Sequence, residues 1–401
     1  MPATIPANVN PDLLVWARDQ SGYPADFVAR RLGVTPDRLH SWERGERKPT
    51  VRQTQHLARC YHRPFGLFFL PQPPAVQPLG AEYRRLPGVR PGVESPEFRL
   101  ALRAMSKRRE VILELADEIG LTMPEFATAV HLSDGAVAVG ERVRRTLGLH
   151  LHEQLAWRDE WQAWRRWRSL VEDAGVLVFL FPGVSLAEAR GVSLLDFPLP
   201  AVGINSKEQA PGARIFSLVH EVIHIALALG HEEQVALREN RNDAQWEDME
   251  RFAEEAAGQA IIPGEALGVE LRKLGAPPTR WDIVQVRTLA SRFRVTALAM
   301  ATRLRAAGVM NWDVYQQWKT SWDEYLSHMK PRKAGMATPV EKALGRGGRP
   351  FAQIVLEALD ANRITAVDAC QHLDLKFDHF ETLRAELRNE RSSPAAADDG
   401  D

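Results

Sequence analysis

The chain has 401 residues, of which 45% are hydrophobic and 26% are charged. These fractions are those of ordinary globular proteins and exclude wholesale disorder, and at about 100–200 residues per domain the length predicts two to four folded units. The formal net charge of −1 is too small to indicate a charged partner for the molecule as a whole.

The N-terminal segment, residues 1–70, predicts a bundle of short helices with a mildly basic balance. It contains ten Lys plus Arg against six Asp plus Glu, a difference of 10 − 6 = +4. An apolar pattern over 25–32 stops at Gly33, and Thr35 with Pro36 then supplies an N-cap and a first-turn proline for the next helix. A helix, a glycine-containing turn and a second helix together make a helix-turn-helix.

The predicted recognition helix of this segment runs from Pro36 to Arg44. Six polar residues are expected to face double-stranded DNA: Arg38, His40 and Ser41 toward base edges, and Arg44, Arg47 and Lys48 toward phosphates. The helix has none of the Gln or Asn residues that commonly read adenine. A protein-interaction or vestigial role is therefore the alternative to DNA binding.

A helical pattern follows from about 96 to 174, and it contains a tryptophan stripe. Trp157, Trp161 and Trp164 recur at steps of four and three, which places three indoles on one helix face. We expect a buried packing stripe, and the alternative is a ligand-binding aromatic surface.

The pattern changes after Gly175 and predicts a small sheet. Val176–Phe181 and Ala201–Asn205 are short runs rich in strand-forming residues. Helices are expected again over about 213–229 and 242–262. The fold class is therefore predicted as mainly α with a small β-sheet, or α+β.

The location of the protein is predicted from two features. The two cysteines, Cys60 and Cys370, lie in segments predicted to belong to different domains, so a disulfide framework is not expected. The first twenty residues lack a basic start followed by an apolar core, and apolar runs such as Val176–Phe181 are far shorter than the roughly 20 residues that span a bilayer. We expect a cytoplasmic protein without a membrane partner.

The helix predicted over 213–229 carries the motif His220-Glu221-Val222-Ile223-His224. Residues four apart on a helix are rotated by only about 40°, so the two imidazoles project from one face and can share one metal ion. The carboxylate of Glu221 can reach a metal-bound water without being a ligand, which suits a general base. The alternative is a structural helix whose two histidines are satisfied by hydrogen bonds.

A catalytic zinc needs a third protein ligand and an open position for water. The next predicted helix offers Glu247, Glu250, Glu254 and Glu255. The motif resembles that of zincins of the Glu class, which place the third ligand on such a second helix, often with a polar partner four residues later that orients one histidine. We expect Glu250 as the ligand and Glu254 as its partner, with Glu247 or Glu254 as alternative ligands.

Longer stretches resemble the ImmA/IrrE family of metallopeptidases. The resemblance rests on Arg214–His224, on Glu250–Glu254, on Ala256–Gly258 before Ile262–Pro263, on Tyr83–Pro87, on Val202–Asn205 and on Leu289–Leu304, while Trp42–Pro49 is similar to the end of an Xre-type recognition helix. It implies a long member of the family that fuses an Xre-type DNA-binding domain to the peptidase. Two departures are that Glu254 stands where Asn or Asp is usual, and that the residues after 330 are too few for a GAF-like sensor.

The resemblance implies a division of the chain into domains and linkers. We expect an Xre-type helix-turn-helix domain at 1–70, a proline-containing linker at 71–95, a zincin-like metallopeptidase domain at 96–280, a helix-turn-helix-like helical segment at 281–330, a linker at 331–350, a C-terminal helical segment at 351–389 and a disordered tail at 390–401. The helix-turn-helix-like segment is expected to pack against the peptidase domain rather than to read DNA.

The function implied by the resemblance is that of a zinc-dependent endopeptidase, with Zn²⁺ as cofactor and a repressor or antitoxin-like protein as substrate. The strand Ala201–Asn205 is expected to bind an extended substrate by β-addition. The candidates for stabilising an oxyanion are His231 and Tyr83. The alternative function is a DNA-binding transcription regulator or antitoxin whose metal site is structural or inactive.

Overall fold

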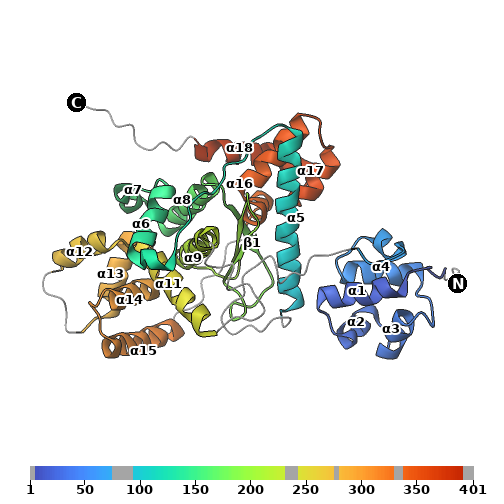
Figure 1. Ribbon diagram of the computed structural model, residues 1–401, viewed down its shortest axis with the longest axis horizontal. Helices are drawn as coiled ribbons and strands as arrows, with labels where there is room; N and C mark the ends of the chain where they lie inside the picture. Colours follow the sequence, from blue (N-terminus) through green and yellow to red (C-terminus); the bar gives the residue numbers. More distant parts are fainter. Residues whose placement is uncertain (1–4, 75–93, 231–242, 275–279, 329–336, 392–401) are drawn as a thin grey trace. The chain divides into compact units, whose positions relative to one another are not determined.

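The computed structural model of the chain describes residues 5–74, 94–230, 243–274, 280–328 and 337–391. The described residues form two compact units, one up to Ala104 and one from Met105 onward. Helices dominate both units, and the second unit also contains a three-stranded sheet (Figure 1). The predicted class, mainly α with a small β-sheet, is confirmed.

The first unit is a bundle of short helices. They are α1 (Pro11–Ser21), α2 (Ala25–Leu32), α3 (Pro36–Glu43), α4 (Val51–Cys60), the 3-10 turn η1 (Phe65–Phe69) and the first part of α5 (Pro96–Glu118). The side chain of Thr35 caps α3, and Gly33 adopts a φ of 69° in the turn between α2 and α3. The core contains Trp42, Tyr61 and Phe68. The predicted helix-turn-helix is therefore present.

The sheet of the second unit has the order β1-β3-β2. Its strands are β1 (Leu177–Phe181), β2 (Gly191–Leu194) and β3 (Ala201–Asn205). β1 pairs parallel to β3, and β2 pairs antiparallel to it on the other side. The prediction that β3 binds an extended substrate is therefore wrong, because both edges of this central strand are already hydrogen-bonded.

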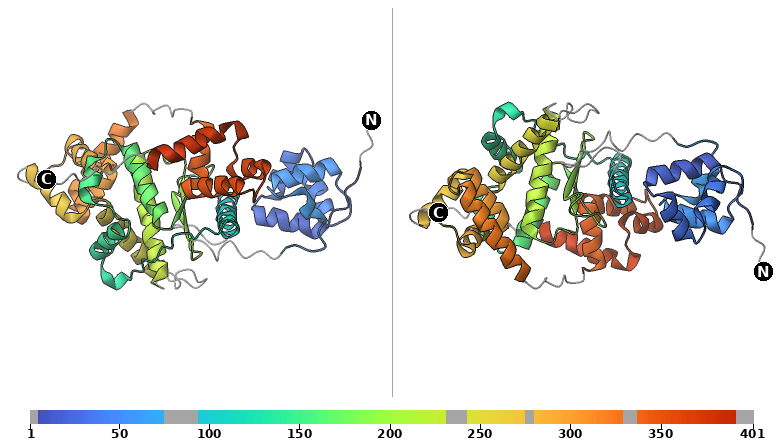
Figure 2. Two further views of the ribbon diagram at one scale, coloured as in Figure 1. Left: turned by 90° about the horizontal axis from the view of Figure 1, so that it is seen from above. Right: turned by 90° about the horizontal axis from the view of Figure 1, so that it is seen from below.

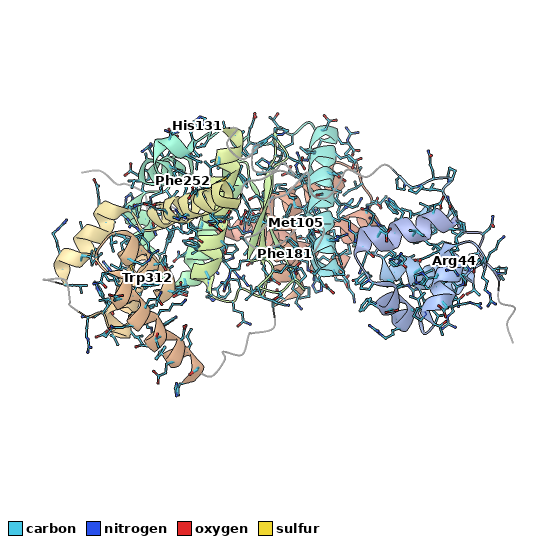
Figure 3. The ribbon with its side chains drawn as sticks, turned by 60° about the horizontal axis from the view of Figure 1, so that its bottom comes forward. Arg44, Met105, His131, Phe181, Phe252 and Trp312 are labelled. Carbon is cyan, nitrogen blue, oxygen red and sulfur yellow. The ribbon has the colours of Figure 1, made fainter. Side chains whose placement is uncertain are left out.

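Close contacts hold α5 against the sheet. A Cβ atom added at Gly203 of β3 would lie 2.6 Å from the sulfur of Met105 on α5 and 3.0 Å from the ring of Phe181 on β1, and Figure 3 shows these two side chains near the sheet. Further along α5, the guanidinium of Arg109 donates to the carbonyl oxygens of Leu199 and Asp196. These bonds fix the loop that leads into β3.

The helix α9 (Pro211–Leu229) packs against β2, β3, α8 (Glu160–Asp173) and α11 (Asp243–Ile261). It is the single helix among the described residues that is long and apolar enough to cross a membrane, and 72% of that stretch is buried inside the second unit. Its apolar surface is therefore used in the core of this unit. Figure 2 shows α9 alongside the sheet from two sides.

The helix α11 is held tightly by α6 (Ala136–Thr146) and by buried polar groups. A Cβ atom at Gly140 of α6 would lie 2.7 Å from the carbonyl oxygen of Ala256, so a glycine allows the two backbones to approach. At the C-terminal end of α11, Arg144 donates to the carbonyl of Ala260 and Gln154 donates to that of Ile261. These bonds satisfy carbonyl groups that a helix end leaves without partners.

The remaining helices complete the second unit. They are α7 (Leu151–Ala156), α12 (Gly264–Lys273), α13 (Ile283–Phe293), α14 (Ala297–Ala306), α15 (Trp312–His328), α16 (Pro339–Asp360), α17 (Ala366–Leu373) and α18 (Phe380–Arg391). The buried side chains of α13 and α14 belong to the same core as those of α9 and α11, as expected for a segment that packs against the peptidase domain.

Two expectations for this unit need correction. Trp157 follows α7, and Trp161 on α8 is 47% exposed, so only Trp164 of α8 and Trp157 reach the core and no single stripe forms. Residues 339–350 belong to α16 and not to a flexible linker, and α16 is kinked at Gly348, whose φ is 79°. The glycine allows a close approach to the sheet, because a Cβ atom at this position would lie 3.1 Å from the carbonyl oxygen of Val178. The tail from 392 lies outside the described residues.

Candidate metal centre

The two histidines of the motif lie together on α9. The helix begins with Pro211 in its first turn, and its buried face, which includes Leu218 and Val222, fixes its rotation about its own axis. The Nε2 atoms of His220 and His224 are 3.2 Å apart. The ring of Phe216, one turn earlier, stacks on that of His220 with centroids 6.3 Å apart. Both imidazoles therefore present the same nitrogen to one point.

The third group comes from α11. Glu250 is 9% exposed, and its Oε2 lies 3.4 Å from Nε2 of His220 while its Oε1 lies 3.6 Å from Nε2 of His224. These side chains form the group of possible metal ligands found among the described residues. Donor atoms at 2.0–2.2 Å from a tetrahedral zinc lie about 3.4 Å apart, so this set of two imidazoles and one carboxylate fits zinc in both spacing and chemistry.

The other glutamates of α11 lie elsewhere. Glu247, Glu254 and Glu255 are exposed, whereas Glu250 is buried. The structure therefore brings to the histidines the glutamate that was expected and neither alternative ligand. The exposure of Glu254 gives no support to an orienting role beside a histidine.

Glu221 is directed toward β2. It is 3% exposed, and its Oε2 accepts a hydrogen bond of 2.5 Å from the hydroxyl of Ser193. A Cβ atom added at Gly191 would lie 2.9 Å from Oε1 of Glu221. Ser193 thus holds one carboxylate oxygen, and the missing side chain at Gly191 leaves space for the other.

Neither Ser193 nor Gly191 was identified from the sequence. β2 has four residues, and its sequence Gly-Val-Ser-Leu contains one serine and one glycine that could serve many structural purposes. β2 pairs with β3, for example Val192 with Gly203, and both strands contact α9. The contact of Ser193 and Gly191 with Glu221 therefore depends on how the sheet packs on α9, and no residue spacing in the sequence predicts it.

The candidates for stabilising an oxyanion, Tyr83 and His231, lie outside the described residues, and so does the segment Tyr83–Pro87.

The residues predicted to face DNA lie on α3 and in the loop after it. The guanidinium of Arg38 lies 6.0 Å from the ring centroid of Trp42, and Nδ1 of His40 lies 3.1 Å from the buried carboxylate of Glu43. Ser41 is 7% exposed and donates to the carbonyl of Arg38 at 2.7 Å. Its predicted contact with a base edge needs correction, because its hydroxyl is buried and used within the helix.

The three residues predicted to contact phosphates are exposed. Arg44, labelled in Figure 3, donates to Glu46 at 2.6 Å, and Nζ of Lys48 lies 2.8 Å from the side-chain oxygen of Asn8. Arg47 is exposed, and its positive charge contributes, after that of Arg44, to lowering the pKa of the Glu46 carboxyl group. A phosphate would compete with Glu46 for both arginines.

The fold and the site together define a metallopeptidase-like domain, in which an HExxH helix is crossed by a second helix that supplies a buried glutamate. Residues 171–305 match the family model of the IrrE N-terminal-like domain, a peptidase family, and residues 14–68 match the model Helix-turn-helix. The chain thus joins an N-terminal helix-turn-helix domain to an IrrE N-terminal-like domain, and the resemblance inferred from the sequence is confirmed. No curated protein matched the chain. A DNA-binding domain joined to a peptidase family domain indicates a regulatory protein.

Proposed function

We propose that the chain is a zinc-dependent endopeptidase with a DNA-binding domain, and that it cleaves a repressor or antitoxin-like protein in the cytoplasm. The observation that carries this proposal is the spacing of 3.2–3.6 Å between the donor atoms of His220, His224 and Glu250. The match of residues 171–305 to a peptidase family supports the reaction class. The helix-turn-helix supports a substrate connected with gene regulation.

Each residue of the site has a role in this proposal. His220, His224 and Glu250 would hold zinc, which when bound supplies a Lewis acid that acidifies water and polarises a peptide carbonyl. Glu221 accepts the proton of the attacking water and returns it to the departing amine. Ser193 keeps the carboxylate of Glu221 in place by its hydrogen bond. Glu254, expected to orient a histidine, is exposed and carries no proton-transfer step in this scheme.

We propose that an extended substrate pairs with β2 and not with β3. Among the described strands, β2 pairs with β3 on one side only, and it lies against α9 beside Glu221. An extended peptide that adds to this strand by main-chain hydrogen bonds would run next to the general base.

Metal content and proteolysis test the proposal together. We expect one zinc per chain in the purified protein and cleavage of an Xre-like repressor encoded beside it, with cleavage lost on chelation and restored by zinc. Bound zinc without proteolysis of any candidate would contradict the endopeptidase proposal and favour the alternative, a DNA-binding regulator or antitoxin with a structural metal site.

For the first unit we propose binding of double-stranded DNA, with Arg38 and His40 near base edges and Arg44, Arg47 and Lys48 near phosphates. The support is the helix-turn-helix match and the exposure of the three phosphate-facing residues. Ser41 is omitted because it is buried.

Replacing Arg47 with Ala is expected to weaken DNA binding about equally for all sequences and to lower the slope of log affinity against log salt by about one unit, because one phosphate contact is lost. Titration of a labelled duplex at several salt concentrations measures both quantities. Arg30→Ala, which removes an exposed arginine of α2, is the matched control and should leave the slope unchanged. Absence of wild-type binding to any duplex at low salt would end the DNA proposal.

A further inference from the structure

One side of α9 is open to solvent at the metal centre. Every residue of this helix from Glu221 to Ala228 is buried, whereas Phe216, Ser217 and His220 are partly exposed. A substrate that reaches the metal therefore meets α9 on the N-terminal side of His220. The ring of Phe216 is already used there, because it stacks on the imidazole of His220. Ser217 is the polar residue of the turn that precedes His220.

The hydroxyl of Ser217 makes no hydrogen bond within the part of the chain that the structure describes. Serine and threonine side chains in helices commonly donate to a carbonyl one turn earlier. Thr288, Ser291 and Ser321 do so, at 2.7–3.1 Å. Because Ser217 is partly exposed and is not bonded in this way, its hydroxyl is available to a group that enters from solvent.

Helix geometry places this hydroxyl beside the general base. Residues three and four apart are neighbours on a helix surface, with Cβ atoms about 5–6 Å apart, so Ser217 is next to both His220 and Glu221. Side chains of a helix lean toward its N-terminus, and those of His220 and Glu221 therefore lean over the turn that contains Ser217. In the proposed reaction Glu221 returns a proton to the departing amine. The substrate residue that carries this amine then lies beside Glu221, within reach of Ser217.

We propose that Ser217 determines specificity for the substrate residue directly after the scissile bond, and that this residue has an uncharged side chain that forms hydrogen bonds. The inference rests on the proposed endopeptidase function and adds one feature of its substrate. A hydroxyl both donates and accepts hydrogen bonds, so Ser217 suits a side chain such as that of threonine. An apolar side chain of the same shape would take water away from the Ser217 hydroxyl without replacing its hydrogen bonds, which weakens binding.

Two substrates of equal shape test this inference. After the cleaved bond of the repressor has been located by mass spectrometry, the residue that follows it is changed to Thr in one version and to Val in the other. We expect the wild type to cleave the Thr version with a kcat/KM about 2–10-fold higher, the net effect of one hydrogen bond. Ser217→Ala should bring this ratio close to one. Ser217→Thr keeps the hydroxyl and should retain the preference.

Binding without cleavage gives a second readout. In the Glu221→Gln background, the Kd of the Thr version should be lower than that of the Val version by a similar factor, and adding Ser217→Ala should make the two Kd values equal. Zinc affinity and Tm should not change in Ser217→Ala. The matched control is Ser321→Ala, which removes an exposed hydroxyl from α15 and should keep the preference of the wild type.

The possible failures are distinguishable. The same preference for Thr in the wild type and in Ser217→Ala, or no preference in the wild type, would overturn this inference and leave the endopeptidase proposal standing. Absence of any cleavage of the unmodified repressor would instead count against the endopeptidase proposal, on which the inference rests.

Discussion

Glu250→Ala is expected to lower zinc affinity by more than about 100-fold while leaving the protein folded. Removal of groups that only orient metal ligands costs 10–100-fold in affinity, and loss of a direct ligand should cost more. The two imidazoles of His220 and His224 would remain 3.2 Å apart on α9, but no carboxylate would close the site from α11. Competition with a chromophoric chelator measures the affinity, and circular dichroism measures the folding.

The control for this prediction is Glu254→Ala, one turn further along the same helix. Glu254 is exposed, so its replacement changes the same charge without removing a group from the cluster, and zinc affinity should stay within a few-fold of the wild type. Equal zinc affinity in Glu250→Ala and the wild type would show that α11 supplies no ligand, and the endopeptidase proposal would lose its third ligand.

The placement of the two histidines could be predicted because it depends on one helix. Residues 220 and 224 share a face in any α-helix, whatever surrounds it. The choice of Glu250 among the glutamates of α11 required more, because it depends on how α11 crosses α9 and α6. Spacing alone left Glu247 and Glu254 open, and resemblance to known zincins, rather than periodicity, selected Glu250. In the structure Glu250 is buried, whereas Glu247 and Glu254 are exposed.

The parts that sequence reasoning missed depend on tertiary contacts. β2 is too short for a periodic signal, so the contact of Ser193 with Glu221 could not be foreseen. Residues 339–350 have the glycine-rich composition of a linker, yet the same glycines permit a close approach of α16 to β1. A high glycine content shows that the backbone of a segment is free of Cβ atoms. It does not show whether that freedom serves a flexible linker or a close contact with another element.

The general base is the second position at which a large effect is expected. Glu221→Gln should keep one zinc per chain and lower kcat/KM for protein cleavage by about 10²–10⁴-fold, the range that a positioned general base contributes. Gln has nearly the same shape, and its amide oxygen can still accept the hydrogen bond from Ser193, so loss of activity would report the lost proton acceptor and not a displaced side chain. Metal analysis and cleavage kinetics on the same preparation give the two quantities.

Ser193 offers a graded version of the same experiment, since it acts only through Glu221. Ser193→Ala removes a hydrogen bond to a carboxylate, and such bonds contribute about 1.5–3 kcal/mol, so kcat should fall by about 10-fold or more with little change in KM. Ser193→Thr keeps the hydroxyl and should recover most of the activity if its methyl group fits.

The two variants have different contradicting outcomes. Full activity in Glu221→Gln would remove Glu221 from the mechanism. Full activity in Ser193→Ala alone would leave Glu221 as the base and show that α9 holds it without help from β2.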